Sequence, residues 1–256
     1  MKALIYEDDR WGNFTPVAYI RPVFDLRCGY WSRYERIGRV LPRAEKAVWV
    51  RDYLAPLAKA RFGVPVNDPS LFSGDLVLVN GRWLAAGDET IDVSKETVAT
   101  AGDEIVYAVL KKETAARLWK GDFAAFLAAV RSSLPASAVS ATVLLYPWNL
   151  IHHNPDVLRK DFVVAGKRGV EGKMAPEAVV YGSKDDVYIA PGAEVHPLAV
   201  LDTSGGPIYL DEKAKVFPFS RVEGPCYLGR DTQIMPGSSI REGNSIGPVC
   251  RVGGEV

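Results

Sequence analysis

The feature that most constrains this chain is a six-residue repeat in its last third. A branched aliphatic residue recurs at every sixth position, in the series Leu210, Val216, Val222, Leu228, Ile234, Ile240, Ile246 and Val252. A period of six is neither the 3.6 residues of an α-helix nor the two residues of a β-strand. Four residues after each aliphatic comes a second column, small or compact at seven of its eight positions: Ala214, Ser220, Cys226, Thr232, Ser238, Asn244, Cys250 and Val256.

This spacing predicts a parallel β-helix, in which the chain coils around a triangular prism with about six residues on each face. One aliphatic residue per face points inward, and the small residue lies where the chain turns the corner. The pattern resembles the hexapeptide repeat of left-handed β-helix proteins, which include acyltransferases and the tails of some sugar-nucleotide enzymes. The alternative is a β-sandwich that shows a period of six by chance.

The same spacing continues upstream. Its aliphatic residues are Ile189, Val195 and Leu201, and its small residues are Ala193, Ala199 and Gly205. The gap from Leu201 to Leu210 is nine residues, so we expect three extra residues within 202–207 to bulge out as a surface loop, which costs little free energy.

The end of the repeat raises a question of its own. The repeat reaches Val252, and the sequence stops four residues later. The last coil of a solenoid needs a cap, because its edge is unpaired and its core is open. Since no helix or polar cap follows, we expect either that another chain covers the edge or that the sequence is a fragment of a longer protein, and we favour the fragment.

The first 150 residues alternate strand and helix patterns and have no period of six. Apolar runs predict strands at 2–8, 46–50, 75–81, 104–110 and 141–147. Helices are predicted after a capping box at Ser32 and Glu35, over 52–63, and over 122–134. This alternation indicates an α/β domain with a mainly parallel sheet. The predicted organisation is an α/β domain over 1–150, a connecting helix and linker over 151–178, and the left-handed β-helix over 179–256.

Composition excludes several function classes. Lys plus Arg and Asp plus Glu both total 31, so no net field attracts nucleic acid or a membrane surface. There is no run of eighteen apolar residues, and the opening MKALIYEDDR does not read as a signal peptide. Three cysteines are too few for a disulfide framework, and no Cys/His cluster has zinc spacing. We therefore expect a cytoplasmic protein with reduced thiols and with no nucleic-acid or membrane partner.

A family resemblance rests on three segments and on the layout. An α/β domain followed by a hexapeptide β-helix is the layout of bifunctional sugar-1-phosphate nucleotidyltransferase/acetyltransferase enzymes. The segment IRPVFDLRCGYWSRYERI (20–37) resembles the TRPV-E-R-G segment of a compact branch of sugar nucleotidyltransferases. The segments LVNGRWL (78–84) and YPWNLIHHNPDVLRKDF (146–162) fit that branch too.

The resemblance implies nucleotidyl transfer. An oxygen of a sugar 1-phosphate attacks the α-phosphorus of a nucleoside triphosphate, and pyrophosphate leaves. The transition state is highly anionic, so catalysis needs fixed cations, a divalent metal ion and backbone N–H groups more than a dedicated base. Ligands of an open α/β sheet bind beyond the carboxyl ends of its strands, which directs attention to the loops after residues 8, 50 and 79.

Arg21 and Arg27 are the catalytic candidates that the resemblance implies. Better-known nucleotidyltransferases carry a lysine at the head of a K-x-L-L-P segment that ends in a glycine. Arg21 matches that lysine, and Gly29 roughly matches the glycine and is a candidate substrate-binding residue. An arginine can hold two phosphate oxygens in its planar fork. The alternative is that both arginines pair with nearby aspartates.

The loop after the first predicted strand departs from the family pattern. The usual G-x-G-T-R phosphate loop is replaced by EDDRWGNF (7–14). Asp8 and Asp9 are candidate ligands for Mg²⁺, because a hard cation prefers carboxylate oxygens. Arg10 is the candidate to replace the missing loop arginine and bind substrate. The alternative is that the two aspartates are solvated turn residues.

The second departure concerns the aspartate that holds the metal ion in the familiar pattern. At the end of the strand near residue 80, this sequence has Asn80, Gly81 and Arg82 instead. Asn80 and Gly81 are candidate substrate-binding residues, since the amide can contact a base or a ribose, but a neutral amide is a weaker metal ligand. The alternative is an ordinary Asn-Gly turn.

Two other function classes stay open. A CoA-dependent acyltransferase would bind its cofactor between the prisms of a trimer and use a histidine base. Only His196 falls in the repeat, with His152 and His153 in the connector, so that active site would lie mostly beyond Val256. The third class is a non-catalytic nucleotide- or sugar-binding protein that assembles through its β-helix. A homotrimer is implied by the resemblance.

Overall fold

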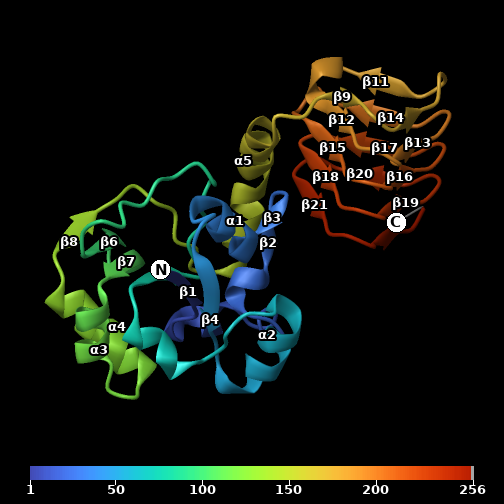
Figure 1. The fold of residues 1–256 in the computed structure, drawn as a ribbon. Helices are drawn as coiled ribbons and strands as arrows, with labels where there is room; N and C mark the ends of the chain where they lie inside the picture. The colour runs from blue at the N-terminus through green and yellow to red at the C-terminus, as the bar shows by residue number, and fades with distance from the viewer. Residues whose placement is uncertain (255–256) are drawn as a thin grey trace. The chain divides into compact units, whose positions relative to one another are not determined.

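The structure, a computed structural model, describes residues 1–254, so Val256 of the predicted small column lies outside the described residues. The chain forms two compact units (Figure 1). The first contains Met1–Leu26 and Trp31–Asn149, and the second contains Arg27–Tyr30 and the chain from Leu150 onward. No helix of the described chain combines the length and the apolar composition that crossing a bilayer requires.

The first unit is built on a six-stranded sheet in the order β4-β1-β5-β7-β6-β8. Its strands are β1 Lys2–Tyr6, β4 Glu45–Trp49, β5 Leu76–Asn80, β6 Thr97–Ala101, β7 Glu104–Leu110 and β8 Ala136–Ala138. β1 runs parallel to β4 and β5, and β6 runs parallel to β8, whereas β7 is antiparallel to both of its neighbours. The predicted α/β class with a parallel-rich sheet is confirmed.

Helices cover both faces of this sheet. Alternate residues of each strand point to opposite sides, so each strand contributes side chains to both cores. On β1, Ala3 and Ile5 face one core and Leu4 and Tyr6 face the other. The first core includes residues of α1 (Arg33–Val40) and α2 (Ala55–Phe62), and the second includes residues of α3 (Lys112–Leu118) and α4 (Phe123–Ser133). Both faces are therefore buried, which explains the continuous apolar runs of the central strands.

Local signals set the helix ends where the sequence predicts them. Ser32 and Glu35 form the capping box of α1, and Asp122 caps α4 by accepting a hydrogen bond from the N–H of Ala125 at 2.6 Å. α2 ends at Gly63, whose φ of 63° suits a residue without a side chain. The short 3₁₀ helices are η1 Asp9–Phe14, η2 Val23–Asp25, η3 Asp52–Leu54, η4 Pro69–Ser73 and η5 Lys184–Asp186.

Two predicted elements differ in the structure. The strand expected at 141–147 is wrong: within the described residues this segment makes one isolated antiparallel bridge, between Val143 and Trp83. Ala141 and Val143 instead pack against the first core. The connecting helix expected within 151–178 begins earlier, since α5 spans Pro147–Ala165 and contains Pro155.

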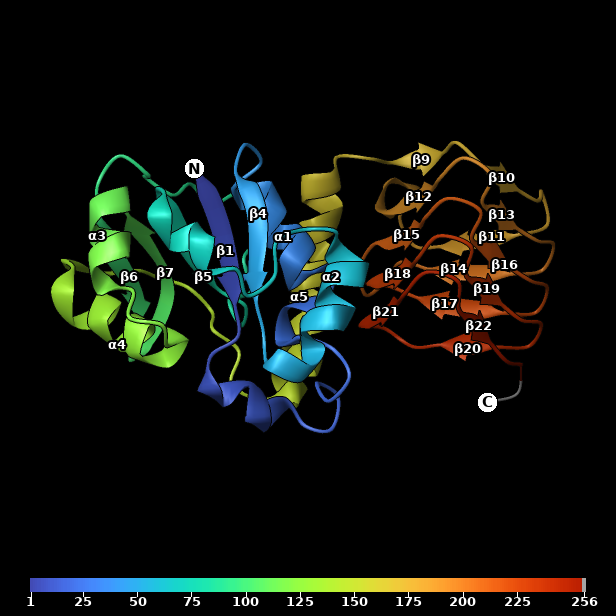
Figure 2. The same cartoon turned by 60° about the horizontal axis from the view of Figure 1, so that its bottom comes forward.

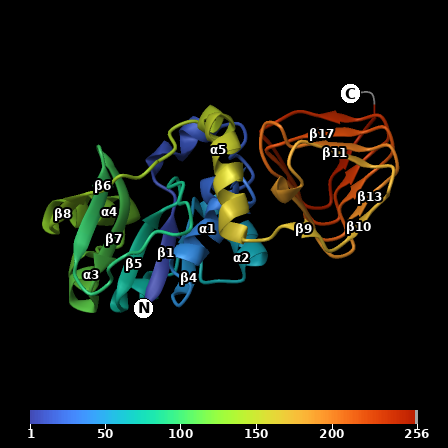
Figure 3. The ribbon, with the colours of Figure 1, turned by 90° about the horizontal axis from the view of Figure 1, so that it is seen from above.

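The second unit contains three parallel sheets, whose strands follow one another in turn along the chain. The orders are β10-β13-β16-β19-β22, β11-β14-β17-β20 and β21-β18-β15-β12-β9. Figure 2 shows their successive coils, and Figure 3 shows the three-sided path of the backbone. The strands of these three sheets are β9 Gly169–Val170, β10 Lys173–Met174, β11 Val179–Tyr181, β12 Val187–Ile189, β13 Glu194–Val195, β14 Val200–Asp202, β15 Ile208–Leu210, β16 Lys215–Val216, β17 Arg221–Glu223, β18 Cys226–Leu228, β19 Gln233–Ile234, β20 Ser239–Ile240, β21 Asn244–Ile246 and β22 Arg251–Val252. Two further short strands, β2 Arg27–Cys28 and β3 Trp31–Ser32, pair with each other in a separate sheet.

The interior of these coils is the predicted aliphatic series. Leu210, Val216, Val222, Leu228 and Ile234 are fully buried, Ile240 is 7 % exposed, and Ile246 and Val252 pack against this core. The parallel register pairs Leu210 with Leu228 and Val216 with Ile234, so equivalent positions stack from coil to coil. The predicted fold class, an α/β unit followed by coils consistent with a left-handed parallel β-helix, is confirmed.

The small column is confirmed from Ala214 to Ser238, and one upstream member differs. Gly205 lies exposed in the 202–207 loop, whereas Ile208 stands in register with Cys226 and is buried. The three extra residues shift the count, so the corner position falls on Ile208. The loop itself is present, between β14 and β15.

Candidate functional site

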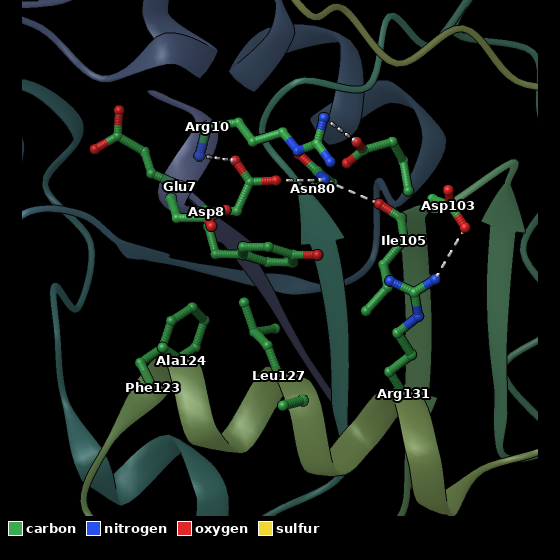
Figure 4. Close-up of a pocket in the computed structure, with 14 residues that line it drawn as sticks. Glu7, Asp8, Arg10, Asn80, Asp103, Ile105, Phe123, Ala124, Leu127 and Arg131 are labelled. Carbon is green, nitrogen blue, oxygen red and sulfur yellow. Dashed lines mark hydrogen bonds and ion pairs between the residues drawn. The ribbon is translucent and has the colours of Figure 1, made fainter. Parts of the chain in front are cut away.

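A pocket of about 410 Å³ opens at the carboxyl ends of β1 and β5, the edge where ligands of α/β sheets bind (Figure 4). Three segments form its walls: the chain leaving β1, the turn between β6 and β7, and α4. Its lining residues are Tyr6, Glu7, Asp8, Asp9, Arg10, Asn80, Asp103, Glu104, Ile105, Phe123, Ala124, Leu127, Ala128 and Arg131.

The end of β1 positions the acidic side of the pocket. β1 stops at Tyr6, and η1 starts at Asp9 with Asp8 as its N-cap. The Asp8 carboxylate accepts a hydrogen bond from the backbone N–H of Arg10 at 3.2 Å. This cap turns the chain away from the sheet and leaves the side chains of Asp9 and Arg10 exposed at the pocket edge.

Arg82 is buried beside this turn and joins two walls of the pocket. Its Nε and Nη2 donate to Oδ1 and Oδ2 of Asp8 at 2.9 and 2.5 Å, and Nη2 also donates to Oε2 of Glu104. Its Nη1 donates to the carbonyl oxygen of Leu144 at 2.9 Å. Burial alone would lower the pKa of Arg82, but Asp8 and Glu104 outweigh it and raise that pKa above its usual value.

Asn80 supports the same network with both ends of its side-chain amide. The oxygen accepts from the N–H of Arg82 at 2.9 Å, and the nitrogen donates to Asp8 Oδ2 at 3.2 Å and to the carbonyl oxygen of Ile105 at 2.9 Å. Asn80 is 1 % exposed. Its amide therefore holds β5, β7 and the Asp8 turn together, and a ligand would have to displace one of these bonds to use it.

Glu7 forms a second buried network on the other side of β1. Its carboxylate accepts from the N–H of Val23 at 2.8 Å and pairs with Arg51 Nε at 3.1 Å. Arg51 in turn stacks on Trp11, 3.9 Å from the ring centroid. Burial raises the pKa of Glu7 above its usual value, and the bonds from Val23 and Arg51 offset this only in part.

The remaining walls supply an apolar surface and a second cation. Phe123 and Leu127 of α4 face the pocket, and the Tyr6 ring meets Phe123 edge-on with centroids 5.6 Å apart. Arg131, also on α4, pairs with Asp103 at 3.4 Å (Figure 4). Both of these charged side chains are more than half exposed, so the pair is free to open.

The predicted site residues fall into different places. Asp8, Asp9, Arg10 and Asn80 come together in the pocket. Gly81 is not among the lining residues, and an added Cβ there would meet the Tyr6 carbonyl oxygen and the Phe24 ring at 2.7 Å. A glycine is needed there for close packing of the backbone.

Arg21, Arg27 and Gly29 are not among the lining residues of the pocket. Arg21 is exposed in the first unit, and its carbonyl oxygen accepts from Arg51 Nη2 at 3.1 Å. Arg27 and Gly29 belong to the second unit, where Arg27 lies 5.7 Å from the ring centroid of Tyr227. Gly29, at a φ of 70°, donates to Oδ1 of Asn154 at 2.6 Å. Their predicted catalytic and binding roles stay predictions.

The acidic residues do not form a metal site by themselves. Both oxygens of Asp8 accept hydrogen bonds from Arg82, and Glu104 pairs with Arg82 and with Arg10, at 3.1 Å for Arg10. Within residues 1–254, no three His, Cys, Asp or Glu side chains lie close enough together to hold a metal ion. Of the two predicted metal ligands, Asp9 takes no part in these ion pairs and is exposed on the pocket edge.

Sequence reasoning missed Arg82, Glu104 and Arg131. A signal for Arg82 exists, because it is the one charged residue in the apolar run LVLVNGRWLAA (76–86), and a lone charge there is expected to be buried and paired. Glu104 and Arg131 carry no such signal, since charged residues at a turn and on a helix surface are common.

The fold and the pocket define the class of protein. An α/β unit with a polar pocket at the carboxyl ends of its parallel strands, followed by a β-helix, is the layout of sugar-nucleotide enzymes described above. The chain belongs to the sugar nucleotidyl transferase family, whose family model matches residues 3–168. No curated protein matches the chain.

Proposed function

We propose that this protein transfers a nucleotidyl group from a nucleoside triphosphate to a sugar 1-phosphate, giving a nucleoside diphosphate sugar and pyrophosphate. The observation that carries the proposal is the pocket at the carboxyl ends of β1 and β5, which lies within the matched family region. Family membership supports nucleotidyl transfer to a sugar phosphate in general.

The charges of the pocket suggest how the substrates divide it. Arg10 and Arg131 are the lining cations, and their exposed guanidinium groups suit phosphate oxygens. The carboxylates of Asp9 and Asp103 suit the hydroxyl groups of a sugar or a ribose, which donate hydrogen bonds to them. The apolar side chains of α4 offer a surface for a ring.

In the proposed reaction, an oxygen of the sugar 1-phosphate forms a bond to the α-phosphorus while the bond from that phosphorus to the leaving pyrophosphate breaks. Arg10 would stabilise the charge that develops on the phosphoryl oxygens, since Glu104 and the Asp8 cap hold it at the pocket edge. Arg21 remains a candidate for the same role. A divalent cation is predicted from the resemblance and would enter with the triphosphate, with Asp9 as its candidate protein ligand.

Non-catalytic binding is the second candidate function, and one observation favours it. The amide of Asn80 and the carboxylate of Asp8, at the position of the expected metal ligands, are both engaged by other residues of the protein. A pocket of this kind would bind nucleotide without turnover. Acyl transfer stays a prediction, with His196 stacked on Phe217 at 4.7 Å, and so does assembly into a homotrimer.

The test of the proposal is pyrophosphate release. The protein is incubated with each nucleoside triphosphate, a panel of sugar 1-phosphates and Mg²⁺, and a coupled assay reports pyrophosphate. Release that requires one triphosphate and one sugar 1-phosphate supports transfer. If no combination of substrates releases pyrophosphate, but a nucleotide raises the melting temperature of the protein, the result supports non-catalytic binding instead.

A further inference from the structure

Arg82 is the cation around which one wall of the pocket is assembled. It is fully buried and makes ion pairs with Asp8 and Glu104, two carboxylates that line the pocket. These carboxylates come from different elements, since Asp8 follows β1 and Glu104 begins β7. A buried guanidinium therefore joins the two acidic walls of the pocket.

The charges in this cluster are already balanced. Asp8 and Glu104 supply two negative charges, and Arg82 and Arg10 supply two positive charges at distances of ion pairs. Every carboxylate oxygen is engaged, because Arg82 binds both oxygens of Asp8 and Oε2 of Glu104, while Arg10 binds Oε1 of Glu104. A divalent cation between them would have to displace a guanidinium and would leave excess positive charge.

We propose that Arg82 takes the place of a protein-bound divalent cation in this pocket. The free protein holds Asp8 and Glu104 on Arg82, and it does not bind Mg²⁺ between them. Arg82 is thereby also a positioning residue, because the carboxylates that it fixes contact Arg10. The inference does not depend on turnover, since a nucleotide-binding protein without activity would have the same arrangement.

The first arm of the test uses Mn²⁺ alone, with free Mn²⁺ followed by electron paramagnetic resonance. The wild-type protein and the Asp8→Asn/Glu104→Gln double variant are expected to give the same binding curve up to about 1 mM Mn²⁺, the weak end of protein carboxylate sites. A wild-type site with one Mn²⁺ per chain that disappears in the double variant would overturn the proposal. A Mn²⁺ site that the double variant retains does not involve Asp8 or Glu104. The wild-type and double-variant curves are then equal, which is the result that the proposal expects.

The second arm uses Arg82→Met, with Arg131→Met as a matched control that removes another arginine of the same pocket. Without its guanidinium, the acidic pair is expected to gain a site for one Mn²⁺ per chain that the wild type lacks, because the two carboxylates lose their counter-charge. Arg131→Met should bind Mn²⁺ as the wild type does. A folded Arg82→Met protein with the wild-type curve contradicts the proposal, and if this variant does not fold, the wild-type titration decides alone.

Discussion

Arg82 and Asp8 are 74 positions apart in the sequence and form a two-point ion pair in the pocket wall, with Nε–Oδ1 and Nη2–Oδ2 distances of 2.9 and 2.5 Å. Arg82 is fully buried, and the side chain of Asp8 is 14 % exposed. The pair places a fixed cation beside the turn that carries Asp9 and Arg10, so the stability of the first unit and the shape of its pocket depend on the same contact.

Breaking this pair is expected to destabilise the first unit. Arg82→Met removes the buried guanidinium that pairs with two nearly buried carboxylates and should lower the free energy of unfolding by about 3–5 kcal/mol. The exposed Arg131–Asp103 pair is the control, and Arg131→Met should cost less than about 1 kcal/mol. Tryptophan emission during urea unfolding measures both, because all six tryptophans belong to the first unit: Trp11, Trp31, Trp49, Trp83, Trp119 and Trp148. Equal midpoints for the two variants would show that the buried pair is not a major contact.

Arg10 is predicted to bind the phosphate groups of the substrate. Arg10→Met removes an exposed guanidinium from the pocket and should weaken pyrophosphate binding at least about tenfold, since a hydrogen bond to a charged group contributes about 1.5–3 kcal/mol. Arg117→Met removes an equally charged, exposed residue of α3 and should leave binding unchanged. Isothermal titration calorimetry with pyrophosphate measures both, and an unchanged affinity for Arg10→Met would exclude Arg10 from the phosphate site.

Glu7 is expected to make stability fall as the pH rises. Its pKa in the folded protein is above its ordinary value of 4.5, so between these two values the native state binds more protons than the unfolded state. The free energy of unfolding then decreases as the pH rises through this window. Glu7→Gln removes the titration, and its stability should decrease less than that of the wild type over the same range.

Asp92 provides the control of opposite sign. Hydrogen bonds from the side chain and the N–H of Ser94 hold the pKa of Asp92 below its ordinary value, so it contributes stability at higher pH that is lost on acidification. Asp92→Asn should therefore lose less stability than the wild type as the pH falls. Urea unfolding at a series of pH values tests both variants, and parallel pH profiles for the wild type and Glu7→Gln would contradict the burial argument.

The β-helix core is predicted to respond to a single cavity. Ile234 is fully buried between Val216 and Val252 of the adjacent coils, so Ile234→Ala should cost about 2–5 kcal/mol. Val249 is 71 % exposed, and Val249→Ala should change little. Far-UV circular dichroism follows this unit, whereas tryptophan emission should not change with either variant. A wild-type melting curve for Ile234→Ala would mean that this position is not a core position.

The β-helix could be predicted from the sequence because each coil repeats one local geometry. The aliphatic position recurs in a fixed register, so the burial of Leu228 and Ile234 can be predicted without any knowledge of distant contacts. The predicted register fails only where three residues are inserted. There the prediction assigned the corner position to Gly205, whereas Ile208 occupies it in the structure. The strand expected at 141–147 was wrong, because an apolar run alone does not show whether it pairs with a sheet or packs against it.

The pocket was only partly predictable, since its contacts join residues far apart in the chain. The position of Asp8, Asp9 and Arg10 follows from the end of a predicted strand, and α/β topology directs attention there. That Arg82 engages Asp8, and that Gly29 meets Asn154 at a separation of 125 residues, follows only from the tertiary structure. No periodic pattern encodes such pairs.

Transfer of a labelled nucleotidyl group tests the central claim most directly. The protein is incubated with nucleoside triphosphates labelled at the α-phosphorus and with sugar 1-phosphates, and the products are separated by chromatography. We expect the label to appear in a nucleoside diphosphate sugar with the wild type and to be strongly reduced with Arg10→Met. Label that stays in the triphosphate, in a folded wild-type protein that binds the same nucleotide, would contradict transfer and identify the pocket as a binding site without turnover.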